Sequence, residues 1–267
     1  MRRHLRAALC GALLMLVGAC EGPIQPSFAA APPAAARPVL APEARPRLWY
    51  VGVALYGENW SENDVAQVAT RLEQTADGFR VVPSVLSNRA ESGPQRHPIA
   101  SRDNIEQATA AIARRASAGD VVFLYVSTHG SPGLLARDLG GGGLEAVGTR
   151  ELRAWLAPLG ARPTVLVLSA CFSGSLIPPL HADNRIIVTA ARADRSSFGC
   201  RPDAEHSVFG EAFLDALDRP HESLRTIVEK TERDVAARER AMAVSRPSDP
   251  QVFVGPAVAA LYDAAVF

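Results

Sequence analysis

Residues 164–171, TVLVLSAC, form an uninterrupted apolar run that ends in a cysteine, and the small residues of FSGS (172–175) follow it. A second run, VVFLYVSTHG (121–130), ends in His129 and Gly130. Continuous apolar runs are typical of parallel strands that are buried on both faces, whereas half-exposed strands alternate apolar and polar residues. The two runs therefore predict central strands of a parallel sheet that is covered by helices on both sides.

The segments around these two runs alternate between strand-like and helical patterns. Further strands are expected at 47–57, 79–87, 185–192 and 251–255, and helices at about 62–75, from Ser101 to Gly119, and at 149–156, 208–217 and 222–242. The glycine-rich stretch DLGGGGLEAVG (138–148) is expected to be a flexible loop near the functional edge. This alternation predicts an α/β fold, and 267 residues suffice for one large domain or two small ones.

The N-terminal segment differs from the rest of the chain. Three arginines among the first six residues precede an apolar run, 7–17, that is too short to span a bilayer and is typical of an export signal. The run leads into VGAC (17–20), which resembles the lipobox of bacterial lipoproteins, so Cys20 is expected to carry lipid. An ordinary signal peptide and a short buried helix are the alternatives. Residues 22–47 are dominated by alanine and proline and are expected to form a tether.

The predicted organisation is therefore a signal peptide at 1–19, a tether at 20–47 and a folded domain at 48–267. Basic and acidic residues number 28 each, so no basic surface for nucleic acid is expected. The chain has neither a CxxC nor an HxxxH pattern, and its GGGG run lacks the GK[ST] ending of a phosphate loop. No metal site and no cofactor are therefore expected. Cys171 and Cys200 are the two cysteines left to form a disulfide, which an oxidising compartment permits.

His129 and Cys171 are expected to meet because each follows one of the two central strands. A parallel crossover brings the carboxyl ends of both strands to one edge, where open sheets bind ligands, and neighbouring strands lie about 4.8 Å apart. An imidazole can take the proton of a nearby thiol, and the amides of Gly130 and Cys171 are the expected donors to an oxyanion. Taken singly, a buried core cysteine and a hydrogen-bonded histidine are the simpler interpretations. Together the two residues favour a catalytic pair.

The segments FLYVSTHGSPG (123–133) and VLSACFSGS (167–175) resemble the legumain family of cysteine peptidases, which shares a caspase-like fold with caspases and gingipains. The resemblance extends to IIVTAARADRSSFGC (186–200) and SVFGEAFLDAL (207–217). It implies a three-layer sandwich with a mostly parallel, six-stranded sheet. It also implies peptide-bond cleavage, in which Cys171 attacks the carbonyl to give an acyl-enzyme and His129 protonates the leaving amine.

The resemblance points to further site residues. An asparagine after the first strand assists catalysis in legumains, and Asn59 or Asn63 matches it. Legumains carry a pocket glutamate two residues before the nucleophile, where this chain has Ser169. The residues that match other polar positions of the substrate pocket are Ser196, Ser197 and Glu211. The resemblance thus implies a small polar pocket, without the asparagine preference.

The expected function is that of a membrane-anchored bacterial cysteine endopeptidase that acts on peptide or protein substrates. Such a lipoprotein would be exported and would face the periplasm or the cell exterior. Two alternatives stay open. A transamidase would use the same dyad with an amine in place of water, and a non-catalytic lipoprotein would use the fold to bind a partner.

Overall fold

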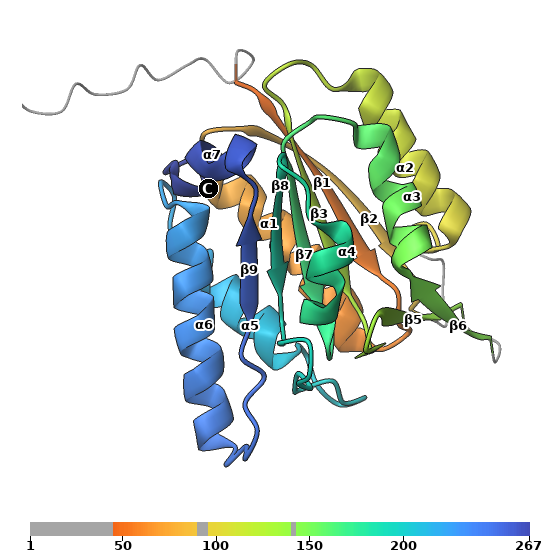
Figure 1. Ribbon diagram of the computed structural model, residues 1–267, viewed down its shortest axis with the longest axis vertical. Helices are drawn as coiled ribbons and strands as arrows, with labels where there is room; N and C mark the ends of the chain where they lie inside the picture. Colours follow the sequence, from red (N-terminus) through yellow and green to blue (C-terminus); the bar gives the residue numbers. More distant parts are fainter. Residues whose placement is uncertain (1–44, 90–95, 140–142) are drawn as a thin grey trace, which may run out of the picture. The chain divides into compact units, whose positions relative to one another are not determined.

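The computed structural model describes residues 45–89, 96–139 and 143–267. Cys20 and the predicted signal peptide lie outside the described residues, as does the tether up to residue 44. The centre of the described part is a six-stranded sheet with the order β2-β1-β3-β7-β8-β9 (Figure 1). Its strands are β1 (Arg47–Ala54), β2 (Arg80–Ser87), β3 (Val121–Ser127), β7 (Thr164–Ser169), β8 (Arg185–Thr189) and β9 (Gln251–Val254).

Five of the six strands are parallel, and the edge strand β9 runs antiparallel to β8. Every residue of β3 and of β7 is buried. The continuous apolar runs therefore form central strands, as the sequence predicts. The mostly parallel, six-stranded α/β sheet is confirmed.

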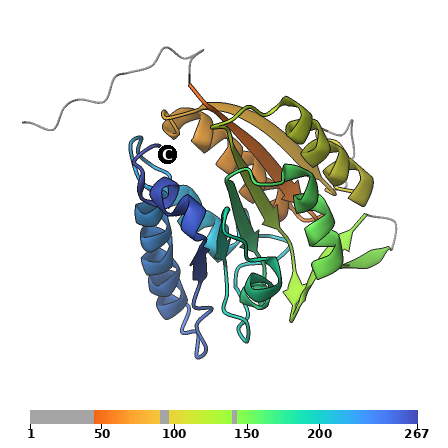
Figure 2. The ribbon, with the colours of Figure 1, turned by 45° about the horizontal axis from the view of Figure 1, so that its top comes forward.

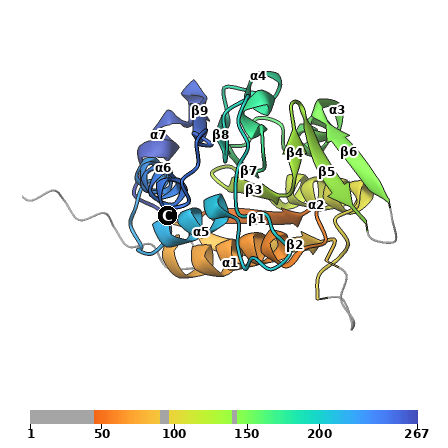
Figure 3. The same cartoon turned by 90° about the horizontal axis from the view of Figure 1, so that it is seen from below.

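Helices cover both faces of the sheet (Figures 1 and 3). One face packs against α1 (Asn59–Thr75), α5 (Val208–Ala216) and α6 (Leu224–Ala241). The other packs against α2 (Arg102–Arg115), α3 (Thr149–Leu156) and α4 (Ile177–Leu180). A short helix, α7 (Ala259–Asp263), lies near the C-terminus.

Two apolar cores result from this three-layer arrangement, because successive side chains of a strand point to opposite faces. Phe123 and Tyr125 of β3 belong to the core beneath α1, α5 and α6. Val122 and Leu124 belong to the core beneath α2, α3 and α4. The sheet is thus fixed from both sides, which makes its carboxyl edge a rigid support for a site.

Helix starts follow the local sequence signals. The Ser101 side chain accepts a hydrogen bond from the Asn104 N–H at the start of α2, as predicted for a capping serine. Ser207 and Ser223 cap α5 and α6 in the same way. The helix expected at 149–156 is α3, with Gly148 as its N-cap and Thr149 as its first helical residue.

The prediction of a flexible loop at 138–148 is wrong for the described residues of this segment. A second sheet forms here from β4 (Gly130–Ser131), β5 (Leu134–Asp138) and β6 (Leu144–Gly148), and it lies beside α3 (Figures 2 and 3). The ribbon is stable because Leu135 and Val147 face each other across it and are buried. Buried Arg137 adds ion pairs to Glu145 and Glu151. Residues 140–142 lie outside the described residues.

No helix within the described ranges is both long and apolar enough to cross a membrane.

Candidate active site

The carboxyl ends of β3 and β7 place His129 and Cys171 at one edge of the sheet. Ser127 pairs with Ser169 in the parallel register, and the Thr128 N–H donates to the Ser169 carbonyl at 3.1 Å. His129 and Cys171 each follow two residues after this pair. The two residues therefore leave neighbouring strands at the same level, as the topology argument predicts.

Gly130 packs directly against the backbone of Cys171. A Cβ atom at Gly130 would overlap the Cys171 carbonyl oxygen and lie 3.1 Å from the Ala170 Cβ. Only glycine fits here without displacing one of the two segments. This close approach joins the chain after β3 to the chain that carries the thiol.

The Cys171 side chain is a free, half-buried thiol. The Ser197 N–H donates to its Sγ at 3.2 Å, and the Ser197 carbonyl lies 3.5 Å from the same atom. The next residue, Phe172, adopts a left-handed conformation with φ 56°, and its N–H donates to the Arg195 carbonyl at 2.8 Å. The loop at 195–197 therefore holds the thiol, which both accepts from and donates to the backbone of Ser197.

The His129 ring lies against two aromatic side chains and one carboxylate. Its centroid is 4.4 Å from that of Tyr56 and 5.2 Å from that of Trp60, both edge-on. Nε2 lies 3.9 Å from Glu58 Oε2, which also accepts the Trp60 Nε1–H at 2.5 Å. Burial lowers the pKa of His129, and the Glu58 charge partly offsets this effect. The imidazole is therefore neutral at neutral pH, as a general base requires.

A buried polar network lies at the same strand ends. Asp64 of α1 accepts hydrogen bonds from the hydroxyls of Ser207 at 2.7 Å and Ser127 at 3.1 Å. Its other oxygen lies 2.9 Å from His206 Nδ1. The Ser169 hydroxyl lies 3.3 Å from that of Ser207, which links this predicted pocket residue to the network. Burial raises the pKa of Asp64. The pKa of His206 is also raised, because its hydrogen bond and charge interaction with Asp64 outweigh burial.

The chain matches the model of the peptidase C13 family over residues 101–244, a segment that contains both His129 and Cys171. It belongs to the peptidase C13 family. Legumains are peptidases of this family, so the resemblance drawn from the strand-end segments is confirmed. No curated protein is similar enough to match the chain.

The fold of this C13 peptidase is similar to that in the crystal structure of caspase-1 from Spodoptera frugiperda. The TM-score is 0.51 and the sequence identity 18%, over 79% of this chain and 87% of that chain. The likeness shows a caspase-like fold. Family and fold together support a cysteine peptidase, which would act on peptide or protein substrates.

The two asparagines suggested by the resemblance lie at different places on α1 of the C13 peptidase. Asn59 is the exposed first residue of the helix. Asn63 lies one turn later, and its Nδ2 donates to the Glu205 carbonyl at 3.0 Å. Neither makes a hydrogen bond to His129 or Cys171 within the described part of the chain, so an assisting role stays a prediction.

The remaining pocket residues are not brought to one place. Ser197 contacts Cys171 through its backbone, and Ser196 beside it is exposed. Glu211 is half-exposed on α5, where its carboxylate lies 2.7 Å from Arg238 of α6. The structure thus places Glu211 at the α5–α6 surface, where the ion pair accounts for its charge.

Four residues of the site were not predicted from the sequence. Glu58, which faces His129, and the aromatic Tyr56 and Trp60 all lie in the segment YGENW (56–60) just after β1. Their position just after a third predicted parallel strand could have indicated that these residues lie at the same sheet edge as His129 and Cys171. Asp64 was missed because its partner His206 is 142 residues away in the sequence.

Proposed function

We propose that this C13 peptidase is an endopeptidase in which Cys171 is the nucleophile and His129 the general base and acid. One observation carries the proposal. His129 and Cys171 follow the paired residues Ser127 and Ser169 by two positions each, with Gly130 packed on the Cys171 carbonyl.

The reaction begins when His129 takes the proton of the Cys171 thiol and the sulfur attacks the substrate carbonyl carbon. The new C–S bond forms as the carbonyl π electrons move to oxygen, and the amides of Gly130 and Cys171 are the proposed donors to that oxyanion. The C–N bond then breaks, and His129 gives its proton to the leaving amine. Water, deprotonated by His129, adds to the thioester carbonyl. The C–S bond then breaks, the carboxylic acid product leaves, and the proton on His129 returns to the Cys171 sulfur.

Glu58 acts as a positioning residue for the imidazole. It lies on the Nε2 side of His129, at 3.9 Å, which is too long for a direct hydrogen bond but close enough for charge attraction. The ring nitrogen that faces away from Glu58 is then the one left for proton transfer. Tyr56 and Trp60 hold the ring edge-on and restrict its rotation.

The substrate pocket is proposed to lie between the 195–197 loop and the end of β7. Ser169 is buried there and linked to the Asp64 network, and the exposed Ser196 hydroxyl is available to a substrate. Such a pocket suits a small polar side chain. Asn59 and Asn63 remain the candidates for an assisting amide.

We also propose that the peptidase is an exported bacterial lipoprotein. The support is in the sequence: an arginine-flanked apolar run, the VGAC motif that ends in Cys20, and the Ala/Pro-rich residues 22–47. Two or more acyl chains on Cys20 would hold the chain on a membrane, since one chain alone binds weakly.

The direct test is cleavage of a fluorogenic peptide library, varied at the residue before the cut, by the full chain. Turnover is expected in the wild type and a loss of at least about a thousandfold in Cys171→Ala, because the nucleophile is removed. Cys200→Ala removes the other thiol of the folded part and is expected to retain turnover. Equal turnover in the wild type and Cys171→Ala would refute the proposed mechanism.

A further inference from the structure

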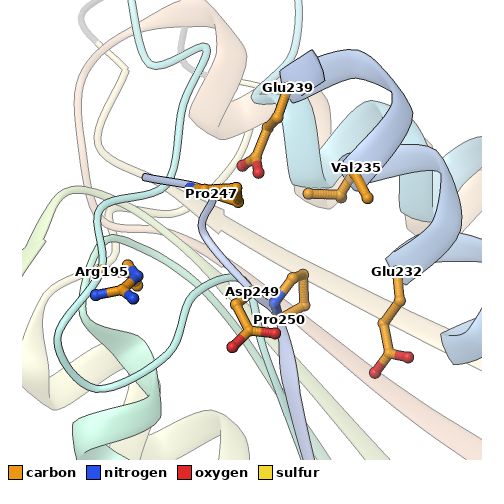
Figure 4. A pocket seen from close by; sticks show the side chains of 8 residues that line it. Arg195, Glu232, Val235, Glu239, Pro247, Asp249 and Pro250 are labelled. Atoms are coloured by element: carbon orange, nitrogen blue, oxygen red, sulfur yellow. The ribbon is translucent and has the colours of Figure 1, made fainter. Parts of the chain in front are cut away.

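A pocket of about 430 Å³ lies between α6, the loop that follows β8 and the start of β9 (Figure 4). Its walls combine apolar and acidic residues. Val235, Pro247 and Pro250 provide apolar surface, and Glu232, Glu239 and Asp249 provide carboxylates. None of these six residues has a part in the catalytic dyad.

Two of the four charged residues that line the pocket already have partners. Arg195, on the side of the pocket opposite α6, lies 2.7 Å from Asp194. Asp249 lies 3.2 Å from Arg192. Glu232 and Glu239, by contrast, form no ion pair with any residue of the described ranges. The pocket therefore carries two carboxylates without a cation.

Glu239 is the more informative of the two because it is 2% exposed. Its Oε2 accepts the Ser248 N–H at 3.0 Å, whereas its buried Oε1 has no hydrogen-bond partner. Figure 4 shows this carboxylate directed from α6 into the pocket, between Pro247 and Val235. A buried carboxylate oxygen without a donor is costly, and the buried Ser248 hydroxyl, which also has no partner, does not supply one. A ligand that brings a donor would therefore stabilise this charge.

Glu232 lies at the half-buried rim of the pocket and is the second carboxylate without a cationic partner among the described residues. Burial, together with the like charges of Glu229 and Asp249, raises the pKa of Glu232. A cation in the pocket would oppose this rise in the pKa of Glu232, because it would stabilise the charged carboxylate. The carboxylates are not placed as metal ligands, since the described residues contain no group of three acidic, histidine or cysteine side chains that could hold a metal ion.

A lysine or arginine side chain has the chemistry that this pocket lacks. Its methylene stem matches the apolar walls of Val235, Pro247 and Pro250, and its charged tip supplies the missing donors to Glu239 and Glu232. A purely apolar ligand would leave the Glu239 oxygen unpaired. An anionic ligand would be repelled.

The pocket and the nucleophile share one loop. Arg195 lines the pocket, and its carbonyl accepts the N–H of Phe172, the residue after the nucleophile. Two residues later, the Ser197 N–H contacts the Cys171 sulfur. An extended peptide advances about 3.3 Å per residue, so a peptide held at Cys171 can place a side chain a few positions away on another part of this loop.

We propose that this pocket binds a lysine or arginine side chain of the peptide substrate, so that the enzyme selects substrates with a basic residue a few positions from the cleaved bond. The proposal rests on the proposed function, because it takes the ligand to be a substrate of the Cys171 site. It adds a specificity pocket that is separate from the small polar pocket at Ser169.

The test measures peptide binding without cleavage, in full-length Cys171→Ala. The probes are fluorescent decapeptide mixtures in which one position at a time is lysine or norleucine and the other positions are randomised. Norleucine retains the methylene stem and lacks the ammonium group. At one position, lysine is expected to bind about tenfold more tightly than norleucine, as for a charge-assisted hydrogen bond. Glu239→Gln, added to Cys171→Ala, is expected to reduce this preference to less than about twofold.

Two further variants make the result specific. Glu232→Gln removes a half-buried rim carboxylate and is expected to weaken the lysine preference without removing a buried charge. Glu229→Gln removes the same charge from an exposed position of the same helix, outside the pocket lining, and is expected to retain the preference. Thermal unfolding of each variant identifies any that fail to fold.

The proposal is overturned if no scanned position distinguishes lysine from norleucine, or if Glu239→Gln and Glu232→Gln both retain the preference. Absence of any peptide binding also contradicts it. These results are independent of the Cys171-dependent turnover that tests the proposed function. A chain that binds lysine peptides but cleaves nothing would refute the enzyme and retain the pocket.

Discussion

The two free thiols of the folded part differ in the groups around them. The Cys171 sulfur accepts the Ser197 N–H, and the Cys171 carbonyl lies against Gly130 at the strand ends. Burial, with the nearby Cys171, Asp64 and Glu58, raises the pKa of Cys200 and keeps it a thiol. A cysteine that follows a β-run is therefore assigned a role by its contacts rather than by its place in the sequence.

The residue Glu58 provides a pH-dependent test of the site. Its charge raises the pKa of His129 against the larger, lowering effect of burial. In Glu58→Gln the pKa of His129 should fall further, so the acid limb of the kcat/KM profile is expected to move to lower pH. Glu73→Gln, at an exposed position of α1, should leave the profile unchanged. An acid limb that stays in place or moves to higher pH in Glu58→Gln would show that Glu58 does not act on His129.

Gly130 provides a steric test at the same site. A Cβ at this position overlaps the Cys171 carbonyl oxygen, so Gly130→Ala should displace the nucleophile and reduce kcat/KM by about a hundredfold or more. Gly143→Ala is the matched control, because a Cβ there meets no atom of the described residues within 4 Å. Peptide turnover and thermal unfolding of both variants check this. Wild-type turnover in a folded Gly130→Ala would contradict the close approach described here.

At the scale of elements, the site is assembled from the ends of three parallel strands and the start of one helix. β3 and β7 carry the chains that lead to His129 and Cys171, and the connection from β1 to α1 carries Glu58. The Asp64 network then ties α1 to the residues that precede α5. Gly210 of α5 approaches Asp64 so closely that a Cβ there would overlap its carboxylate.

The Asp64–His206 contact between these elements makes stability depend on pH. The folded-state pKa of His206 is raised above its ordinary value of 6.5, because the hydrogen bond and charge of Asp64 outweigh burial. Its contribution to stability is therefore complete below pH 6.5 and is lost as pH rises through the folded-state pKa. The pKa of His129 is lowered, so this residue affects stability only below pH 6.5, where its protonation destabilises the folded state.

We therefore expect the unfolding free energy of the wild type to fall more steeply than that of His206→Gln as pH rises above 6.5. Urea titrations at several pH values provide this measurement. His181→Gln, at an exposed position, should keep the wild-type slope. Parallel slopes for the wild type and His206→Gln would contradict an ionic Asp64–His206 contact.

Elements with a strong periodic signal were predictable, and elements made by distant partners were not. β3 and β7 follow from continuous apolar runs, and α2 follows from the Ser101 cap. β6 was missed because a run of glycines precedes it, and its stability comes from the pairing of Val147 with Leu135 across the ribbon. Hairpin pairing of this kind is set by tertiary context.

The same distinction applies to the site. The placement of His129, Gly130 and Cys171 at one sheet edge was predictable because strand order brings strand ends together. Glu58 and Asp64 were not, because an acidic residue in a helical segment has many solvent-exposed alternatives, and only the packed structure shows its partner. Glu211 was proposed from resemblance alone, and the structure gives it Arg238 as its partner.

At the scale of the whole molecule, the folded domain and the N-terminal segment have separate roles in the proposal. The domain supplies the chemistry, and Cys20 with the Ala/Pro-rich segment supplies an anchor. Cys20→Ser should remove the acyl chains while leaving peptide turnover unchanged, because acylation requires the thiol. Expression in a bacterial host with a labelled fatty acid, followed by separation of membranes, tests this. Unlabelled wild type, or Cys20→Ser that stays in the membrane fraction, would contradict the anchor.

The central claim is that His129 activates the Cys171 sulfur at one edge of the sheet. The most direct measurement is the rate at which iodoacetamide alkylates each cysteine of the full chain, read by mass spectrometry of peptides. A Cys171–His129 pair predicts that Cys171 reacts at least about tenfold faster than Cys200 and that His129→Ala slows Cys171 alone. Equal, slow alkylation of both cysteines, unaffected by His129→Ala, would contradict it.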